Sequence, residues 1–190
     1  MSLLGSAVLS LSPEDMLLVL CAHGATGCWA RLLLVCDVAQ LISAQPDMDW
    51  TRVLEQASRT GSLRRLLLGL LLARDLLGAA IPCEALSPMA LDTQLPRLAA
   101  QIRGRMLCAR HTAFGHVESC SIHLRMMERV RDRMLYCLGI LHESVTPNST
   151  DRSVVPLPRF LHVLYYLIHP VRLAVTYGPS ALSRLFRRAS

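Results

Sequence analysis

Two carboxylates separated by one residue, Asp47 and Asp49, come closest in this sequence to a metal site by type and spacing. Mg²⁺ prefers hard oxygen ligands, and catalysis with two metal ions needs clustered carboxylates. However, Asp47 follows Gln45-Pro46 in a predicted turn, and Asp49 precedes a helical pattern from Trp50, where Asp is a common N-cap. We therefore interpret both as turn and cap residues, and we predict no catalytic and no metal-binding residue in this chain.

The cysteines could in principle supply thiol or zinc chemistry, but their spacing does not favour it. They stand at positions 21, 28, 36, 83, 108, 120 and 137, with no C-x-x-C pair and no metal-ligand spacing. Such scattered cysteines on apolar helix faces are typical of reduced core thiols in a cytoplasmic protein. The sequence also lacks the G-x-S-x-G, P-loop, H-E-x-x-H and dinucleotide-binding motifs, so other enzyme classes have no motif in it.

Composition favours a helical protein. Apolar residues make up 52% of the 190 residues and aromatic residues only 5%, and leucine dominates. The net charge is +6, and every basic residue is Arg, the side chain that binds phosphate bidentately. Because these charges alternate with acidic residues along the longest predicted helix, we do not expect nucleic-acid binding.

No segment has the pattern of a membrane span or a secretory leader. The most apolar window, Leu66 to Ala73, is flanked by charged residues and falls far short of the roughly twenty residues that a span needs. Met1 to Leu11 has no basic region and leads directly into a helix cap. We therefore predict a buried helix at 66–73, no membrane partner and a cytoplasmic location.

The stretch from Ser12 to Asp37 organises the rest of the chain. Ser12 is a predicted N-cap, and Pro13 fits the first position of a helix that we expect to stop at His23-Gly24. A second helix is predicted from Trp29 to about Ala44. The histidine is interpreted as a residue that caps the first helix end and satisfies a buried partner.

Asp37 is predicted to be buried and paired. It falls on one helical stripe with Trp29, Leu33 and Leu41, so an exposed Asp37 would expose those apolar residues too. A buried carboxylate requires a partner. Arginines from later helices can reach it more easily than His23 can, and we favour Arg172 among Arg64, Arg65, Arg74 and Arg172.

The remaining sequence predicts an all-α, irregular multi-helix bundle. Further helices are expected at 50–60, 63–77, 82–90, 95–109, 118–141 and 160–177, with a Pro- and Ser-rich linker at 146–158. Capping residues are expected at Asp49, Gly61, Ser62 and Gly78. The total is about seven to nine helices, with at most one short strand within residues 3 to 11. The tail at 179–190 is basic.

Several motifs resemble those of the bacterial family called uncharacterised nucleotidyltransferases. The first two are L-S-P-E-D-x-L-L-x-L-C-x-H-G from Leu11 and W-x-R-L-x-x-x-x-D-V-A-x-L-I from Trp29. The later ones are Asp49-Trp50, Leu76-Leu77-Gly78, Arg131-Asp132-Arg133, Leu157-Pro158, Leu164-Tyr165-Tyr166, Pro170-Val171-Arg172-Leu173 and Tyr177-Gly178. The family-motif residues, whose role is unknown, are His23, Trp29, Arg31, Asp37 and Arg172.

The resemblance implies a helical domain at 12–178 that lacks the family's catalytic half. That half, with a Gly-Ser turn for the triphosphate followed by an Asp-x-Asp strand for metal, normally precedes these motifs. Here only residues 1–11 precede them, and they resemble its last strand. Gly5-Ser6 and Gly61-Ser62 do not stand at usable spacing from Asp47 and Asp49.

Two functions follow as expectations from the resemblance. The chain is either a truncated helical portion of a protein that transfers a nucleotidyl group to an unidentified acceptor, or a non-enzymatic helical interaction module. The module's partner would be a separately encoded nucleotidyltransferase core or a second copy. Mg²⁺ and a nucleoside triphosphate are implied only for a full-length family member, and we predict no cofactor in this chain.

Overall fold

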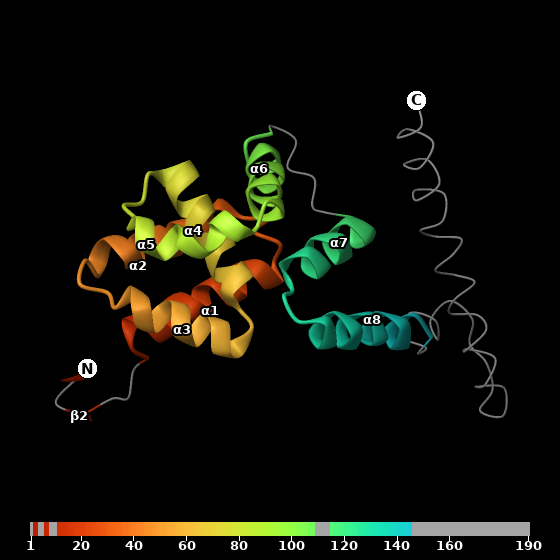
Figure 1. Cartoon of the computed structure of the whole chain (residues 1–190), viewed down its shortest axis with the longest axis horizontal. Helices are drawn as coiled ribbons and strands as arrows, with labels where there is room; N and C mark the ends of the chain where they lie inside the picture. The colour runs from red at the N-terminus through yellow and green to blue at the C-terminus, as the bar shows by residue number, and fades with distance from the viewer. Residues whose placement is uncertain (1, 4–5, 8–10, 109–114, 146–190) are drawn as a thin grey trace. The chain divides into compact units, whose positions relative to one another are not determined.

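The computed structural model describes residues 2–3, 6–7, 11–108 and 115–145. The chain divides into two compact units, Met1–Val130 and Arg131–Ser190. The described helices of the first unit lie in chain order at α1 Pro13–Thr26, α2 Leu32–Ala44, α3 Trp50–Thr60, α4 Leu63–Leu77, α5 Cys83–Leu86, the 3₁₀ helix η1 Ser87–Leu91, α6 Gln94–Met106 and α7 His116–Met126 (Figure 1). The helix α8, Val130–Val145, leads into the second unit.

The architecture is all-α in its described part, as predicted. Besides the eight α-helices there are two strands of two residues each, β1 Ser2–Leu3 and β2 Ser6–Ala7, which pair antiparallel. The sequence predicted at most one strand there, so the presence of a second strand, paired with the first through Ser2–Ala7 and Leu3–Ser6, corrects that prediction. No helix of the described segments combines the length and apolar character that crossing a membrane requires.

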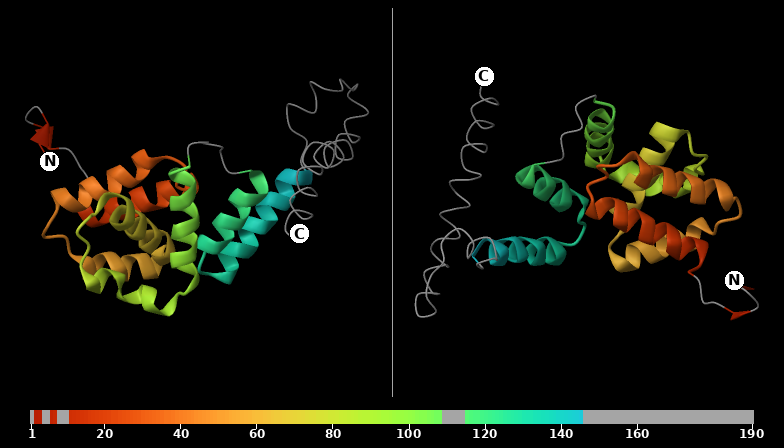
Figure 2. Two further views of the ribbon diagram at one scale, coloured as in Figure 1. Left: turned by 90° about the horizontal axis from the view of Figure 1, so that it is seen from above. Right: turned by 180° about the vertical axis from the view of Figure 1, so that it is seen from behind.

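The helix α4 lies at the centre of the first unit and packs against α1, α2, α3 and α6. Figure 2 shows α1 to α4 gathered into one bundle. All eight residues from Leu66 to Ala73 are buried, which confirms the predicted buried helix. A helix that is apolar on all sides is stable only when neighbours cover every side.

The bounds of α3 and α4 were predicted correctly because their ends are determined locally. The Asp49 carboxylate accepts a hydrogen bond from the backbone N–H of Arg52 at 3.0 Å. Gly61 and Gly78 end the two helices in the left-handed conformation, with φ of 71° and 67°. Ser62 precedes α4, but its side chain makes no capping hydrogen bond.

The predicted stop at Gly24 is wrong, since α1 continues to Thr26 and Gly24 lies buried inside it. The predicted start of the second helix at Trp29 is also wrong. Cys28 and Trp29 have φ values of 51° and 53° and form a tight turn, and α2 begins only at Leu32. The turn places the Trp29 ring against Gly24, and this packing explains the glycine better than a helix end does.

The single long helix predicted at 118–141 is wrong, because the chain breaks between α7 and α8. Met127 is extended, with φ of −86° and ψ of 134°. Ile122 and Met126 are buried as predicted, whereas the later part of the same stripe is more than half exposed. The exposed members described in α8 are Val130, Met134, Leu138 and Leu141.

Some predictions lie outside the described residues. These are the linker at 146–158, the helix at 160–177, the basic tail at 179–190 and the position of Arg172. The expected domain limits at residues 11 and 178 stay predictions.

Candidate functional site

Trp29 is the family-motif residue that the fold places at the centre of the core. Its side chain is fully buried and lies between two helical glycines, Gly24 of α1 and Gly69 of α4. A Cβ at Gly24 would stand 2.5 Å from the indole ring, and one at Gly69 would stand 2.7 Å from the Cys21 Sγ and 2.9 Å from the indole ring. The backbone N–H of Trp29 also donates to the Gly24 carbonyl at 2.8 Å. The role of Trp29 in this structure is therefore packing.

The indole nitrogen of Trp29 is a buried donor with no hydrogen-bond partner among the described residues. A buried polar group without a partner costs free energy, so the packing of the ring has to offset that cost. The close approach of Gly24 and Gly69 permits such packing, because neither residue has a side chain that would separate the helices from the ring.

Three other family-motif residues, His23, Arg31 and Asp37, are exposed. The prediction that Asp37 is buried and paired is therefore wrong. Asp37 does share one face of α2 with Leu33, which is 65% exposed, but that face points to solvent. The buried face consists of Val35, Val38 and Ile42.

His23 also differs from its interpretation. It lies in the last turn of α1 as expected, but its side chain is exposed, so the expectation of a buried partner is wrong. No hydrogen bond or ion pair among the described residues joins His23, Arg31 and Asp37 to one another. The structure therefore does not bring these residues together as a reaction centre.

The Asp47 and Asp49 pair does not provide a metal site in this structure. Asp49 uses its carboxylate to cap α3, and Asp47 is exposed in the preceding turn. In the described segments no three His, Cys, Asp or Glu side chains are grouped so that they could hold a metal ion. These carboxylates do not fit the Mg²⁺ that the resemblance implies for a full-length family member.

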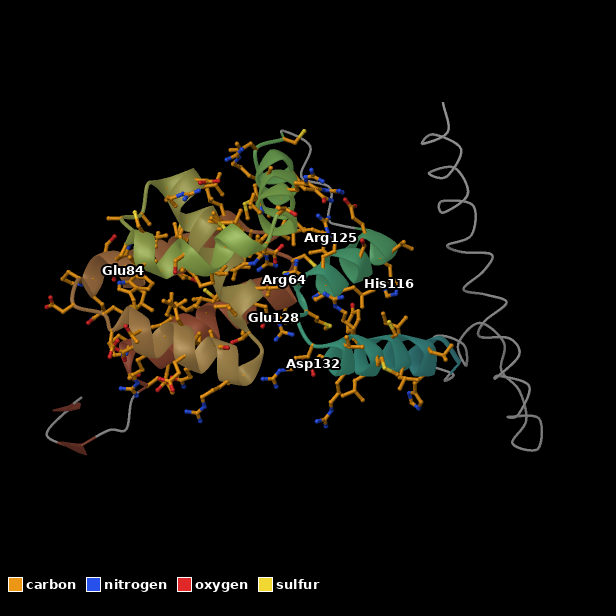
Figure 3. The ribbon with its side chains drawn as sticks, in the orientation of Figure 1. Arg64, Glu84, His116, Arg125, Glu128 and Asp132 are labelled. Atoms are coloured by element: carbon orange, nitrogen blue, oxygen red, sulfur yellow. The ribbon has the colours of Figure 1, made fainter. Side chains whose placement is uncertain are left out.

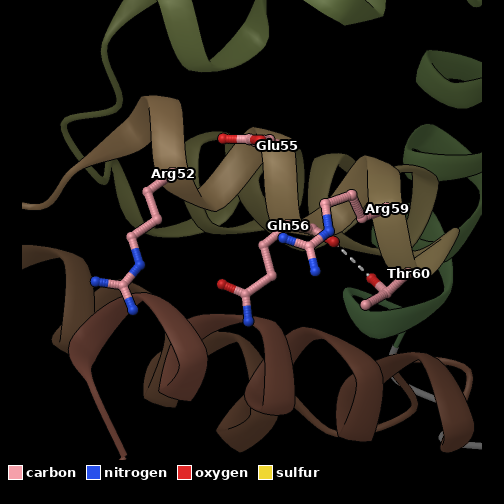
Figure 4. Close-up of a pocket in the computed structure, with 5 residues that line it drawn as sticks. All are labelled: Arg52, Glu55, Gln56, Arg59 and Thr60. Atoms are coloured by element: carbon pink, nitrogen blue, oxygen red, sulfur yellow. Dashed lines mark hydrogen bonds between the residues drawn. The ribbon is translucent and has the colours of Figure 1, made fainter.

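A polar groove of about 400 Å³ lies along one face of α3 (Figure 4). It is lined by Arg52, Glu55, Gln56, Arg59 and Thr60. The Gln56 amide donates to the Asp15 carboxylate of α1 at 2.6 Å, so acidic groups lie beside the arginines. The lining therefore carries charges of both signs, from Glu55 and from Arg52 and Arg59.

A second polar contact joins the turn after α1 to α7 and was not found from the sequence. The Sγ of Cys28 lies 3.6 Å from Nδ1 of His123, and Nδ1 lies 2.8 Å from the Ser119 carbonyl oxygen. The Nε2 atom lies 3.2 Å from the Thr26 carbonyl oxygen. Because burial raises the pKa of the Cys28 thiol, the geometry favours a neutral packing thiol over a nucleophilic thiolate. Since 95 residues separate the cysteine from the histidine, no sequence spacing could have indicated the pair.

Arg64, the second residue of α4, forms a bidentate ion pair with Asp92. Its guanidinium donates to both oxygens of Asp92 at 2.7 and 3.1 Å, and one of these oxygens also accepts from the N–H groups of Gln94 and Leu95. Burial tends to raise the pKa of Asp92, but the hydrogen bonds and charge of Arg64 and the two N–H groups outweigh burial, so the pKa lies below its usual 3.8.

The comparisons with known proteins agree with the predicted resemblance. Residues 1–78 match the family model described as an uncharacterised nucleotidyltransferase. The resemblance is thus confirmed over the residues that hold α1 to α4, which include His23, Trp29, Arg31 and Asp37. The motifs after residue 78 lie beyond the match. No curated protein and no solved structure matches the chain.

Proposed function

We propose that this chain supplies the helical portion of a nucleotidyltransferase-family protein and that it does not transfer nucleotidyl groups by itself. In this proposal the nucleotide-binding half lies outside the chain, and the acceptor is unidentified. The observation that carries the proposal is the family match over 1–78, because it coincides with four packed helices in which Asp49 caps α3 and Asp37 and Asp47 are exposed.

A direct transfer assay tests the proposal. The purified chain is incubated with Mg²⁺ and each of the four labelled nucleoside triphosphates, with a cell lysate as the source of acceptors. We expect no labelled product above a blank without protein. Transfer that is lost in both Asp47→Ala and Asp49→Ala, while α-helix content by circular dichroism stays unchanged, would contradict it.

A second candidate function is a non-enzymatic interaction module that binds a separate catalytic half or a second copy of the chain. The observation that favours it is the exposure of apolar side chains on the first two helices. Val19 of α1 is 50% exposed, and Leu32 and Leu33 of α2 are 49% and 65% exposed. Exposed apolar patches often mark interaction sites, because burying them is favourable by about 25 cal/mol per Å².

Sedimentation equilibrium tests this second function for self-association. We expect the wild-type chain to associate at micromolar concentrations and the Leu33→Glu variant to shift toward monomer. Ala44→Glu, on an exposed position at the end of the same helix, is the matched control and should associate like the wild type. A wild-type chain that is monomeric and binds no apolar dye would argue against an interaction module.

A further inference from the structure

Two of the three residues between α7 and α8, Glu128 and Arg129, contact a corner of the first unit that is distant in sequence. The Glu128 carboxylate accepts a hydrogen bond of 2.5 Å from the backbone N–H of Arg64, near the start of α4. Arg129 donates to the carbonyl oxygens of Ser58 and Arg59, at 3.3 and 2.5 Å, at the end of α3. Figure 3 shows Glu128 beside Arg64 at this corner.

The two charges match the two helix ends. A helix N-terminus carries unpaired N–H groups and favours an anion, and a C-terminus carries unpaired carbonyl groups and favours a cation. The acidic residue contacts the start of α4 and the basic residue contacts the end of α3. Glu128 therefore supplies a side-chain cap for α4 that Ser62 does not, and Arg129 adds a cation at the end of α3, where the backbone N–H of Gly61 already donates to Ala57 and Ser58.

Gly61 makes room for this contact. Its φ is 71°, a value that residues with a side chain rarely adopt. A Cβ at this position would stand 2.8 Å from Nε of Arg129. The same glycine thus ends α3 and leaves space for the guanidinium to cross the corner. Since Gly61 lies within the family match and Arg129 lies beyond it, the contact joins the two parts of the chain.

We infer that Glu128 and Arg129 form a latch, meaning a releasable side-chain clamp that holds the chain between α7 and α8 on the α3–α4 corner. Release breaks the hydrogen bonds of Glu128, which is half-buried, and of Arg129, which is exposed. Ile122 and Met126 anchor α7 separately, since both are buried in the hydrophobic core. Opening therefore releases Glu128 and Arg129 from the α3–α4 corner, while α7 and the core remain folded.

The amide proton of Arg64 reports whether the latch is closed. The first amides of a helix have no acceptor within the helix, so the protection of this amide from exchange depends on Glu128. The Arg52 amide is a matched control, since Asp49 caps it in the same way on α3. Hydrogen exchange followed by NMR separates the two amides.

We expect Glu128→Gln and Arg129→Gln each to raise the rate of hydrogen exchange at the Arg64 amide. For Glu128→Gln the rate should rise about tenfold, which is the change expected when one charge-assisted hydrogen bond is lost. Exchange at Arg52 and within 66–73 should stay unchanged, and the control variant Glu55→Gln should have no effect at Arg64. Proteolysis after Arg129 or Arg131 should become faster in Glu128→Gln.

A double-mutant cycle distinguishes contact with Arg129 from backbone strain at Gly61. In the wild-type background, Gly61→Ala should raise the exchange rate of the Arg64 amide. In an Arg129→Ala background, the same substitution should change that rate little further. Unchanged exchange at Arg64 in both charge variants would overturn the latch. Equal increases at Arg64, at Arg52 and within 66–73 would also overturn it, because they would indicate global unfolding instead of local release.

Discussion

The region that matches the family, α1 to α4, and the region that follows it, α5 to α7, are held in place by different forces. In the first, glycines and a buried Trp29 allow close packing, and no ion pair among the described residues joins one of the four helices to another. In the second, apolar anchors such as Leu98 and Ile122 are supplemented by ion pairs. Arg105–Glu118 lies within this region, and Arg64–Asp92 and Arg103–Asp75 join it to α4.

The difference indicates how each region tolerates change. The stability of the first region depends on close packing, so adding or removing one methyl group in its core should lower the free energy of unfolding markedly. Polar contacts near the surface orient the second region, and such contacts are individually weaker and are screened by salt. Substitutions in the two regions should therefore differ in size and in their response to solution conditions.

The largest expected effect is the loss of Trp29. Trp29→Ala should lower the free energy of unfolding by about 3–5 kcal/mol, because the cavity between Gly24 and Gly69 cannot close fully. Thermal and urea unfolding monitored by circular dichroism measures this change. Trp50→Ala, at a half-buried position, is the control and should cost less. Equal losses of unfolding free energy for Trp29→Ala and Trp50→Ala would contradict the special role of Trp29 in packing the first region.

Glycine substitutions sharpen the comparison, since the same change should have opposite signs in the two regions. Gly24→Ala and Gly69→Ala should each destabilise the fold by about 1–3 kcal/mol, because the added methyl group overlaps the Trp29 ring or the Cys21 thiol. Gly104→Ala in α6 should stabilise it by about 0.5–1 kcal/mol, because nothing lies within 4 Å of its Cβ position. Chemical denaturation measures all three, and a destabilising Gly104→Ala would contradict this assignment.

Asp92→Asn tests the polar contacts of the second region. It removes the charge opposite Arg64 and should cost about 1–2 kcal/mol at neutral pH, since both side chains are largely buried. Because the pKa of Asp92 is lower in the folded chain than its usual 3.8, its contribution is complete above that value and is lost as the pH falls through the folded pKa.

The pH dependence of unfolding provides the check for Asp92. Between neutral pH and strongly acidic conditions, the difference in stability between the wild type and Asp92→Asn should shrink toward zero. A difference that stays constant below pH 3 would mean that the charge of Asp92 does not contribute as described.

The smallest structural perturbation is chemical labelling of the native thiols. Burial raises the pKa of the Cys21 thiol to about 12, so alkylation at pH 8 should leave Cys21 unmodified in the folded chain. The exposed Cys83, Cys108 and Cys137 should react first. Mass spectrometry of peptides after timed labelling measures the order, and early labelling of Cys21 would indicate that the first region opens easily.

Local signals explain which parts of the fold the sequence predicted. Asp49, Gly61 and Gly78 act on their own helix ends, and the bounds of α3 and α4 follow from them. The chain break at Met127 could not be predicted in this way. At this break Glu128 and Arg129 pair with a corner more than sixty residues earlier, whereas the helical spacing of apolar residues continues through it.

The burial of Asp37 was predicted wrongly because the helical stripe was assigned to the wrong face of α2. The stripe through Leu33 and Asp37 exists, yet helical spacing alone does not distinguish the face toward the core from the face toward solvent. The sequence predicted a helix end at Gly24, whereas the structure shows that Gly24 makes room for the Trp29 ring. This contact forms because the chain turns through two left-handed residues, Cys28 and Trp29. Single-residue propensities do not indicate such a turn at Cys28 and Trp29.

The environment of Trp29 also makes its intrinsic fluorescence a probe of unfolding. An indole that is fully buried, with a nitrogen that lacks a described hydrogen-bond partner, emits at shorter wavelengths than a hydrated indole. Trp50 is the chain's other tryptophan and is half-buried. In a Trp50→Phe background, the red shift of the remaining emission would therefore follow the opening of α1 to α4 without any added label.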